Sequence, residues 1–116
     1  MASSGVGKTL LKLKANVAKG DYYEAFQMYH SISQRYIKQK KFQEAMDLLQ
    51  DGAINMLEHD QHGSAIDLSE RLVDIFQTQK TPLEKARAPL LEIFYKFPIR
   101  TSYCDQYVML VMKFSH

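Results

Sequence analysis

The N-terminal run Ala2-Ser3-Ser4-Gly5-Val6-Gly7-Lys8-Thr9 is the part of the sequence closest to a chemical motif. It fits a relaxed phosphate-binding loop in which alanine replaces the first glycine. Such a loop works because a strand delivers it and a helix N-terminus receives the phosphate. Only Met1 precedes this run, and no later acidic strand end is available to hold magnesium. We therefore expect residues 1–7 to form a flexible tail, and a nucleotide-binding enzyme is a poorly supported alternative.

The other residues whose side chains could bind a metal or act in catalysis are His59, His62 and Cys104. A metal site would need one or two further ligands beside the histidines, and a nucleophilic cysteine would need a histidine base close to it. The sequence offers neither, because the histidines fall in a polar turn and Cys104 is the single thiol. We therefore predict a protein that is not an enzyme and has no metal, cofactor or catalytic residue.

The composition favours a globular cytosolic protein that does not bind nucleic acid. Hydrophobic residues make up 46% of the 116 residues, and the formal net charge is only +2. Such a small charge argues against binding that depends on phosphate neutralisation. A helical-repeat RNA binder would need a basic concave face and base-reading positions repeated at a fixed offset, and the sequence shows neither. One cysteine excludes an internal disulfide, and the apolar stretch around Tyr107–Met112 is far shorter than the ~20 residues that span a bilayer. We expect a cytosolic protein without direct membrane insertion.

An internal repeat with a step of about twenty residues is the most informative feature. Three segments align at this step: GDYYEAFQMYHSI, KKFQEAMDLLQDGA and DQHGSAIDLSERLV. Within each segment the apolar residues recur at helical spacing, and no alternating strand pattern is present. One step therefore holds a helix of about sixteen residues and a short turn. The aligned positions are Ala25/Ala45/Ala65, Phe26/Met46/Ile66, Met28/Leu48/Leu68 and Tyr36/Met56/Phe76.

Helices joined by such short turns must pack on their neighbours to bury their apolar stripes. The repeated alanine lets adjacent helix backbones approach closely. The pattern predicts an all-α protein, an α-solenoid of antiparallel helix pairs similar to a tetratricopeptide superhelix, over residues 8–116. The apolar C-terminal helix has no polar repeat after it, so we expect a truncated solenoid.

The ends of the predicted helices follow from capping residues. A first helix over Lys8–Lys19 should close at Gly20 in the left-handed conformation. Asp21 and Glu24 form a capping-box pattern for the next helix. Thr81 should cap a later helix that starts at Pro82, runs to about Phe97 and is kinked or delayed by Pro89, and the last helix should cover Ser102–Phe114.

The aligned segments also carry a family resemblance. The run Ala18-Lys19-Gly20-Asp21-Tyr22-Tyr23-Glu24-Ala25 is its most specific part. With Gln27, Tyr36, the spacing Phe42–Glu44–Ala45 and Gly52-Ala53, it resembles the Golgi-to-ER traffic protein four family over about residues 10–77. Weaker similarity to the family follows at Leu90-Leu91, Phe94, Phe97-Pro98 and Lys113-Phe114-Ser115.

The resemblance implies a non-enzymatic cytosolic scaffold that helps guide tail-anchored membrane proteins to the endoplasmic reticulum. In this family the N-terminal half docks on the targeting ATPase. The C-terminal half holds a ubiquitin-like partner and, in animals, a BAG-domain chaperone, and this chain should cover only the first part of the N-terminal half, so the C-terminal half should be missing here. A generic tetratricopeptide module with an unrelated partner is the alternative, although its usual 34-residue repeat differs from a helix pair of about forty residues.

The resemblance places the contacts with the ATPase at Tyr22, Lys38 and Asp67. An aromatic anchor, a cation at a helix end and an anion on a neighbouring helix suit an interface. Each has a plainer reading as well. Tyr22 also lies on the apolar stripe, a lysine at position 38 lacks the bidentate geometry of arginine, and Asp67 could pair with Arg71 on its own helix.

Overall fold

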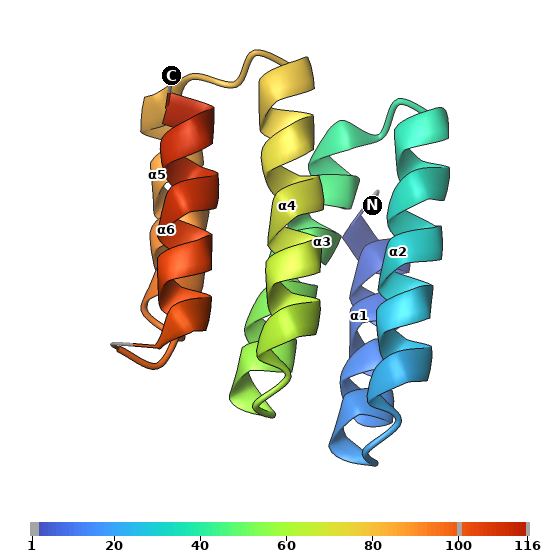
Figure 1. The fold of residues 1–116 in the computed structure, drawn as a ribbon. Helices are drawn as coiled ribbons and strands as arrows, with labels where there is room; N and C mark the ends of the chain where they lie inside the picture. The colour runs from blue at the N-terminus through green and yellow to red at the C-terminus, as the bar shows by residue number, and fades with distance from the viewer. Residues whose placement is uncertain (1–2, 100, 116) are drawn as a thin grey trace.

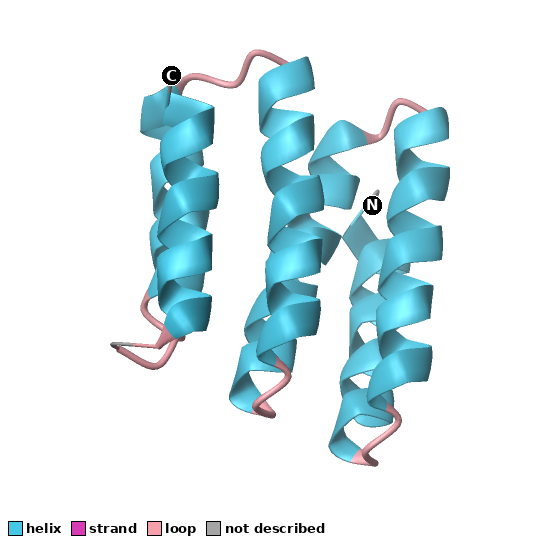
Figure 2. Ribbon diagram, in the orientation of Figure 1, coloured by secondary structure: helices cyan, strands magenta, loops and turns pink. Residues whose placement is uncertain are grey.

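The computed structural model describes residues 3–99 and 101–115, and in this part of the chain all regular structure is helical (Figures 1 and 2). Short loops join consecutive helices, as the turn spacing in the sequence predicted. The helices are α1 (Ser3–Ala18), α2 (Tyr22–Lys38), α3 (Phe42–Glu58), α4 (His62–Thr78), α5 (Leu83–Phe94) and α6 (Ser102–Ser115).

The helices form antiparallel pairs that stack into two layers (Figure 1). One layer contains α1, α3 and α5, and the other contains α2, α4 and α6. Each helix contacts its partner in the pair and the neighbouring helix of its own layer, and α2 also packs extensively on α3 of the next pair. This arrangement confirms the prediction of an all-α solenoid.

The turns repeat with the same twenty-residue step as the helices. Gly20, Lys40, Asp60 and Lys80 all adopt positive φ, with values of 89°, 60°, 60° and 52°. The N–H of the residue after each of them reaches back to a carbonyl five residues earlier, which is the Schellman arrangement. These hydrogen bonds are Asp21 to Asn16 (3.0 Å), Lys41 to Tyr36 (2.8 Å), Gln61 to Met56 (2.8 Å) and Thr81 to Phe76 (2.8 Å).

Replacing Lys80 with glycine is expected to raise the free energy of unfolding by about 0.5–1 kcal/mol. A side chain at φ 52° meets the backbone sterically, and glycine removes that cost at a smaller loss of chain entropy. Urea denaturation followed by circular dichroism measures the change. The matched control is Gln77→Gly, an exposed position inside α4, which should lower the free energy by about 1 kcal/mol. Equal effects of the two substitutions would contradict the role of the turn.

The repeated alanines lie where the helices pack. Ala25, Ala45 and Ala65 are all fully buried. A second small residue marks the contact of α2 with α3, because a Cβ added at Gly52 would lie only 2.8 Å from Cδ1 of Tyr29. Small side chains therefore stand at buried positions of the contacts between α2, α3 and α4, as the repeat predicted.

The helix ends differ from the prediction in several details. The first helix begins at Ser3 instead of Lys8, so the motif-like residues 5–9 form part of α1 and not a loop. Residues 1–2 lie outside the described part of the chain, and the mobility of residues 1–7 stays a prediction. Helix α5 ends at Phe94 instead of Phe97 and includes Pro89 in its interior, without a delayed start.

The predicted caps are also not formed as expected. Asp21 is the N-cap of α2, but its side chain makes no capping hydrogen bond. Its ψ of 58° is not the extended value that aims an N-cap oxygen at the first turn, and its N–H is already donated to Asn16. At α5 the N-cap is Pro82, one residue after the predicted Thr81, because the carbonyl of extended Pro82 accepts the Ala86 N–H.

Candidate functional site

The three predicted contact residues, Tyr22, Lys38 and Asp67, all lie on α2 and α4, in the same layer of the solenoid. Lys38 is the exposed last residue of α2, and Asp67 is a half-buried residue in the second turn of α4. Asp67 occupies the position in α4 that Gln27 occupies in α2, forty residues earlier. Positions 27 and 38 are eleven residues apart, which is close to three full helical turns, so Lys38 and Asp67 lie on corresponding faces of their helices but about 16 Å apart along the helix direction.

A groove lies between these two helices. It has a volume of about 140 Å³, with apolar side chains from Ile37, Phe42 and Ile75 and polar side chains around them. Lys38 directly follows Ile37, and Asp67 is joined to the groove through Arg71. The polar residues that line it are Gln34, Arg71, Asp74, Thr78 and Gln79. We call Lys38, Asp67 and these groove residues the α2–α4 face.

The Asp67 carboxylate is held by its own helix. Its Oδ1 lies 3.2 Å from Nε of Arg71, one turn later, so the i,i+4 pair considered from the sequence is formed. Both side chains remain partly exposed, and such a pair contributes little stability of its own. The pairing orients the carboxylate and leaves Asp67 available to a partner at the edge of the groove.

Tyr22 lies at the opposite end of α2 from Lys38, and sixteen steps of 1.5 Å correspond to about 24 Å along the helix axis. It is closer to the level of Asp67, about 8 Å along the axis, but it is rotated by about 140° from position 27 and so lies on another side of α2. Tyr22 is half-buried against the core, and its ring centroid lies 6.2 Å from that of His59 at the end of α3. Tyr22 is therefore not part of the α2–α4 face, and its role in binding stays a prediction.

Sequence reasoning did not identify the groove itself. Gln34, Asp74 and Thr78 carry no chemical motif, and their importance comes from lying side by side across two helices. The spacing of Asp67, Arg71, Asp74 and Thr78 does contain a signal, because these residues recur every three or four positions and must share one face of α4.

The residues considered for metal or nucleophile chemistry are engaged elsewhere. The Nδ1 of His59 lies 3.0 Å from the carbonyl oxygen of Asn55, and the ring of His62 stacks on Tyr103 with centroids 5.0 Å apart. Among the described residues, no three His, Cys, Asp or Glu side chains are grouped closely enough to hold a metal ion. Cys104 is half-buried in the first turn of α6, where its N–H donates to Oγ1 of Thr101 at 3.2 Å.

Among the described residues, three groups have shifted pKa values, and all three belong to packed parts of the structure outside the α2–α4 face. Burial raises the pKa of Tyr29 to about 12, although the hydrogen bond from Asn55 opposes the shift. Burial also raises the pKa of Asp51, against the attraction of Lys14, and raises that of Tyr107. Both tyrosine hydroxyls therefore stay neutral and can hold hydrogen bonds inside the core.

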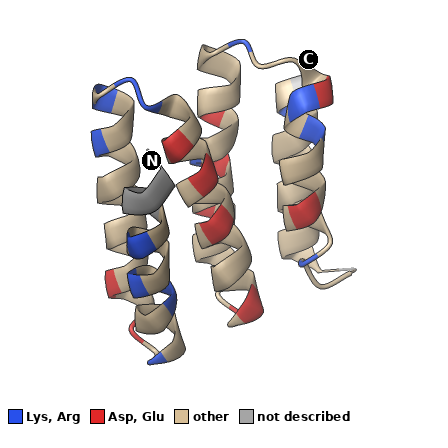
Figure 3. Cartoon of the chain, turned by 180° about the vertical axis from the view of Figure 1, so that it is seen from behind, with Lys and Arg blue, Asp and Glu red and all other residues tan. Residues whose placement is uncertain are grey.

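In the opposite layer, α1 and α3 each carry one sign of charge, whereas α5 carries both. Seen from behind, α1 displays lysines and no acidic residue, while α3 displays acidic residues and no lysine or arginine (Figure 3). The α2–α4 face differs from α1 and α3 because Lys38, Asp67, Arg71 and Asp74 place both signs of charge within one surface. A mixed surface of this kind selects a partner by the arrangement of its charges more than by its net charge.

Comparison with known proteins gives this architecture a family. A model of the family "Golgi to ER traffic protein 4" matches residues 39–116, about two thirds of the chain. The chain belongs to the Golgi to ER traffic protein 4 family. The match includes α5 and α6, where the resemblance seen in the sequence was weakest, so the family similarity extends well beyond residue 77.

Individual relatives agree with this assignment. The Golgi to ER traffic protein 4 homolog of Takifugu rubripes is 41% identical over 80 residues, which cover 69% of this chain and 25% of the relative. The homolog of Homo sapiens is 49% identical over 65 residues, covering 56% of this chain and 20% of the relative. The chain thus spans about a quarter of the length of these family members.

The chain has the same fold as a solved structure of this family. The crystal structure of C. therm. Get4 superimposes with a TM-score of 0.89 at 25% sequence identity, covering 97% of this chain and 37% of that one. Nearly the whole chain is therefore a continuous piece of the family's helical solenoid. None of the described helices is long and apolar enough to cross a membrane.

Proposed function

We propose that this chain is a non-enzymatic cytosolic scaffold in the targeting of tail-anchored membrane proteins, and that its α2–α4 face binds the targeting ATPase. Family membership is the observation that carries the proposal, because scaffolding of this pathway is the role that the resemblance implies. The location of the contact is supported by the links of both charged residues to one groove, since Lys38 follows the groove residue Ile37 and Asp67 pairs with the groove residue Arg71.

The chemistry of the α2–α4 face suits a protein partner. Ile37, Phe42 and Ile75 provide apolar area at the centre, and charged and amide groups surround it. Interfaces commonly combine an apolar centre with a polar rim, where charges set orientation and association rate. Neither catalysis nor a cofactor enters the proposal.

The other partners of the family are not assigned to residues of this chain. The resemblance associates the ubiquitin-like partner and the BAG-domain chaperone with the C-terminal half of the family, and this chain spans about a quarter of its relatives. The proposal is therefore limited to the ATPase contact.

Titration calorimetry with the nucleotide-loaded targeting ATPase tests the proposal. Lys38→Glu and Asp67→Lys should each weaken binding by about tenfold, which corresponds to ~1.4 kcal/mol, because each replaces an attraction at the interface by a repulsion. The charge-matched controls are Lys12→Glu on α1 and Glu84→Lys on α5, two exposed positions in the opposite layer. These controls should bind as the unmodified chain does.

Two results would contradict the proposal. Absence of binding by a chain that circular dichroism shows to be folded would leave a generic helical-repeat module with another partner. Equal weakening by all four variants would show a response to net charge and not to the α2–α4 face.

Tyr22→Ala distinguishes a core role of Tyr22 from a role in binding. Loss of a core residue should lower thermal stability, whereas loss of an interface residue should lower affinity at unchanged stability.

A further inference from the structure

Two hollows adjoin along α3. The first lies between α3, α4 and α5 and has a volume of about 260 Å³. The second lies between α1, α3 and α5 and has a volume of about 220 Å³. Asp47 and Gln50 of α3 line both of them, so the two hollows meet at these side chains. We call the two hollows together the α3 groove.

Apolar side chains form the base of the α3 groove. In the first hollow they come from Met46, Leu72 and Phe76, and in the second from Leu10 and Ile54. Leu72 and Phe76 are buried and the other three are half-buried, so all of them belong to the packed interior more than to the rim. A base of this kind keeps water away from polar contacts made above it, which strengthens those contacts.

Three carboxylates line the second hollow, those of Asp47, Asp51 and Glu92. In the described part of the chain the ion-paired acids are Asp67 and Glu58, so no bound lysine or arginine neutralises these three. The Oδ2 atom of Asp51 is shielded from solvent and has no hydrogen-bond partner there. A shielded oxygen without a donor is unfavourable, so this carboxylate gains from a donor that a ligand brings.

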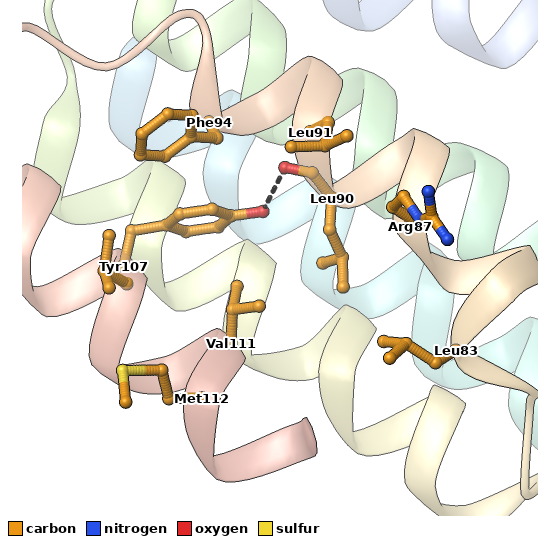
Figure 4. A pocket seen from close by; sticks show the side chains of 9 residues that line it. Leu83, Arg87, Leu90, Leu91, Phe94, Tyr107, Val111 and Met112 are labelled. Carbon is orange, nitrogen blue, oxygen red and sulfur yellow. Dashed lines mark hydrogen bonds between the residues drawn. The ribbon is translucent and has the colours of Figure 1, made fainter.

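Two of the three carboxylates are held in place by glutamines. Nε2 of Gln43 donates to Oδ1 of Asp47 at 2.9 Å, and Nε2 of Gln50 donates to Oε2 of Glu92 at 2.8 Å. The second bond joins α3 to α5 across the groove. Helix α5 is in turn fixed to α6, because the hydroxyl of Tyr107 donates to a backbone carbonyl of α5 at 2.7 Å (Figure 4). The carboxylates are therefore positioned before a ligand arrives, which lowers the entropic cost of binding.

The α3 groove also contains a backbone acceptor. Pro89 lies inside α5 and has no N–H, so the carbonyl of Lys85, one turn earlier, lacks its usual helical partner. Both residues line the first hollow. Together with the carboxylates, this carbonyl favours a ligand that is rich in N–H donors. An arginine side chain fits this requirement, because it carries five N–H donors and no acceptor.

From these observations we propose that the α3 groove binds an extended segment of a partner protein that carries two arginines two residues apart. Such side chains point to the same side of an extended chain and are separated by about 6.6 Å. Asp47 and Asp51 are four residues apart on one side of α3, which corresponds to about 6 Å. One arginine pairs with Asp47, and the other pairs with Asp51 and Glu92.

The α3 groove lies within the described solenoid. The helices that border it are α1, α4 and α5, and all three are packed neighbours of α3. In a solenoid each repeat contacts only its neighbours, so a further helix pair would stack on α5 and α6 and not on α3. Two lysines lie nearby: Lys85 is about 10 Å from Glu92 along α5, and Lys14 attracts Asp51 from α1. Neither forms an ion pair in the described part of the chain.

This inference goes beyond the proposed function and does not depend on it. The α3 groove is built mainly from α3 and α5, whereas the α2–α4 face is built mainly from α2 and α4. Binding of a short peptide is measured without the ATPase, so either proposal can fail while the other stands.

Fluorescence anisotropy with a dye-labelled peptide tests the α3 groove. The peptide Ala-Arg-Ala-Arg-Ala, blocked at both ends, should bind saturably at low ionic strength, where charge pairs are least screened. Asp47→Asn and Glu92→Gln should each weaken binding by about fivefold, because each removes one charged contact and nearly preserves the side-chain shape. The double variant Asp51→Asn with Glu92→Gln should weaken binding by about tenfold, because it removes both partners of one arginine.

Matched controls separate the groove from a general attraction between charges. The peptide Ala-Arg-Arg-Ala-Ala has the same composition, but its arginines point to opposite sides of an extended chain, so it should bind about fivefold more weakly. Glu44→Gln on α3 and Glu84→Gln on α5 remove the same charge from residues that do not line the groove, and should leave binding unchanged. Circular dichroism checks that each variant is helical.

Three results would overturn the proposal. The first is the absence of saturable binding by a folded chain. The second is equal binding of the two peptides, and the third is equal weakening by the groove variants and the control variants. Either of the last two would show that the peptide responds to net charge and not to the arrangement of the carboxylates.

Discussion

Tyr29→Ala is expected to lower the free energy of unfolding by about 3–5 kcal/mol, a large part of the stability of a chain of this size. The ring of Tyr29 is fully buried between α2 and α3, and it fills the space beside Gly52. Its hydroxyl oxygen accepts the Nδ2–H of buried Asn55 at 3.2 Å. Removing the side chain leaves a cavity and an unpaired buried amide together. Urea denaturation monitored by circular dichroism measures the loss.

Tyr29→Phe is the control that separates the two contributions. It keeps the ring and removes only the hydroxyl, so it should cost about 1–3 kcal/mol for the amide left unpaired in the core. If Tyr29→Phe were as damaging as Tyr29→Ala, the hydrogen bond and not the packing would dominate. If neither lowered stability, the assignment of Tyr29 to the core would be wrong.

Tyr107→Ala is expected to loosen the last helix pair while α1 to α4 stay folded. Tyr107 is the buried anchor of α6, where its ring packs on Phe97 with centroids 4.9 Å apart and its hydroxyl bonds the Leu90 carbonyl. The loss should be about 3–5 kcal/mol in the local stability of this pair. In a repeat architecture each unit depends mainly on its neighbours, so the damage stays local. Hydrogen exchange resolved by residue should show lost protection in α5 and α6.

The control for this experiment is again the phenylalanine variant. Tyr107→Phe retains the contact with Phe97 and should keep most of the protection in α6. Uniform loss of protection over all helices in Tyr107→Ala would instead show that the solenoid unfolds as one unit, and the local explanation would then fail.

The repeat in the sequence predicted the helices and their packing because that information is local. A twenty-residue step with apolar residues at helical spacing leaves little freedom other than antiparallel pairs joined by short turns. Ala25, Ala45 and Ala65 were identified as packing positions in this way, and all three are fully buried. The left-handed turn at Gly20 was predicted for a similar reason, since glycine adopts positive φ without steric cost.

The equivalent turns at Lys40, Asp60 and Lys80 were not predicted, because lysine does not favour positive φ and aspartate adopts it only occasionally. Their conformation is imposed by the packing of the helices on either side. The capping residues show the opposite error. The Asp21–Glu24 pattern was present, but the Asp21 N–H is donated to the Asn16 carbonyl in the Schellman turn and is not available to a capping box.

By itself, the sequence determined the class of fold, the length of the repeat and the family resemblance, because each of these depends on residues close together in the chain. Only the tertiary structure showed how the candidate residues lie relative to the groove. Lys38 follows the groove residue Ile37, and Asp67 pairs with the groove residue Arg71, whereas Tyr22 is half-buried beside His59. The tertiary structure also brought α5 and α6 together around an apolar groove. Surfaces of this kind arise where separate helices pack side by side, and no local pattern records that meeting.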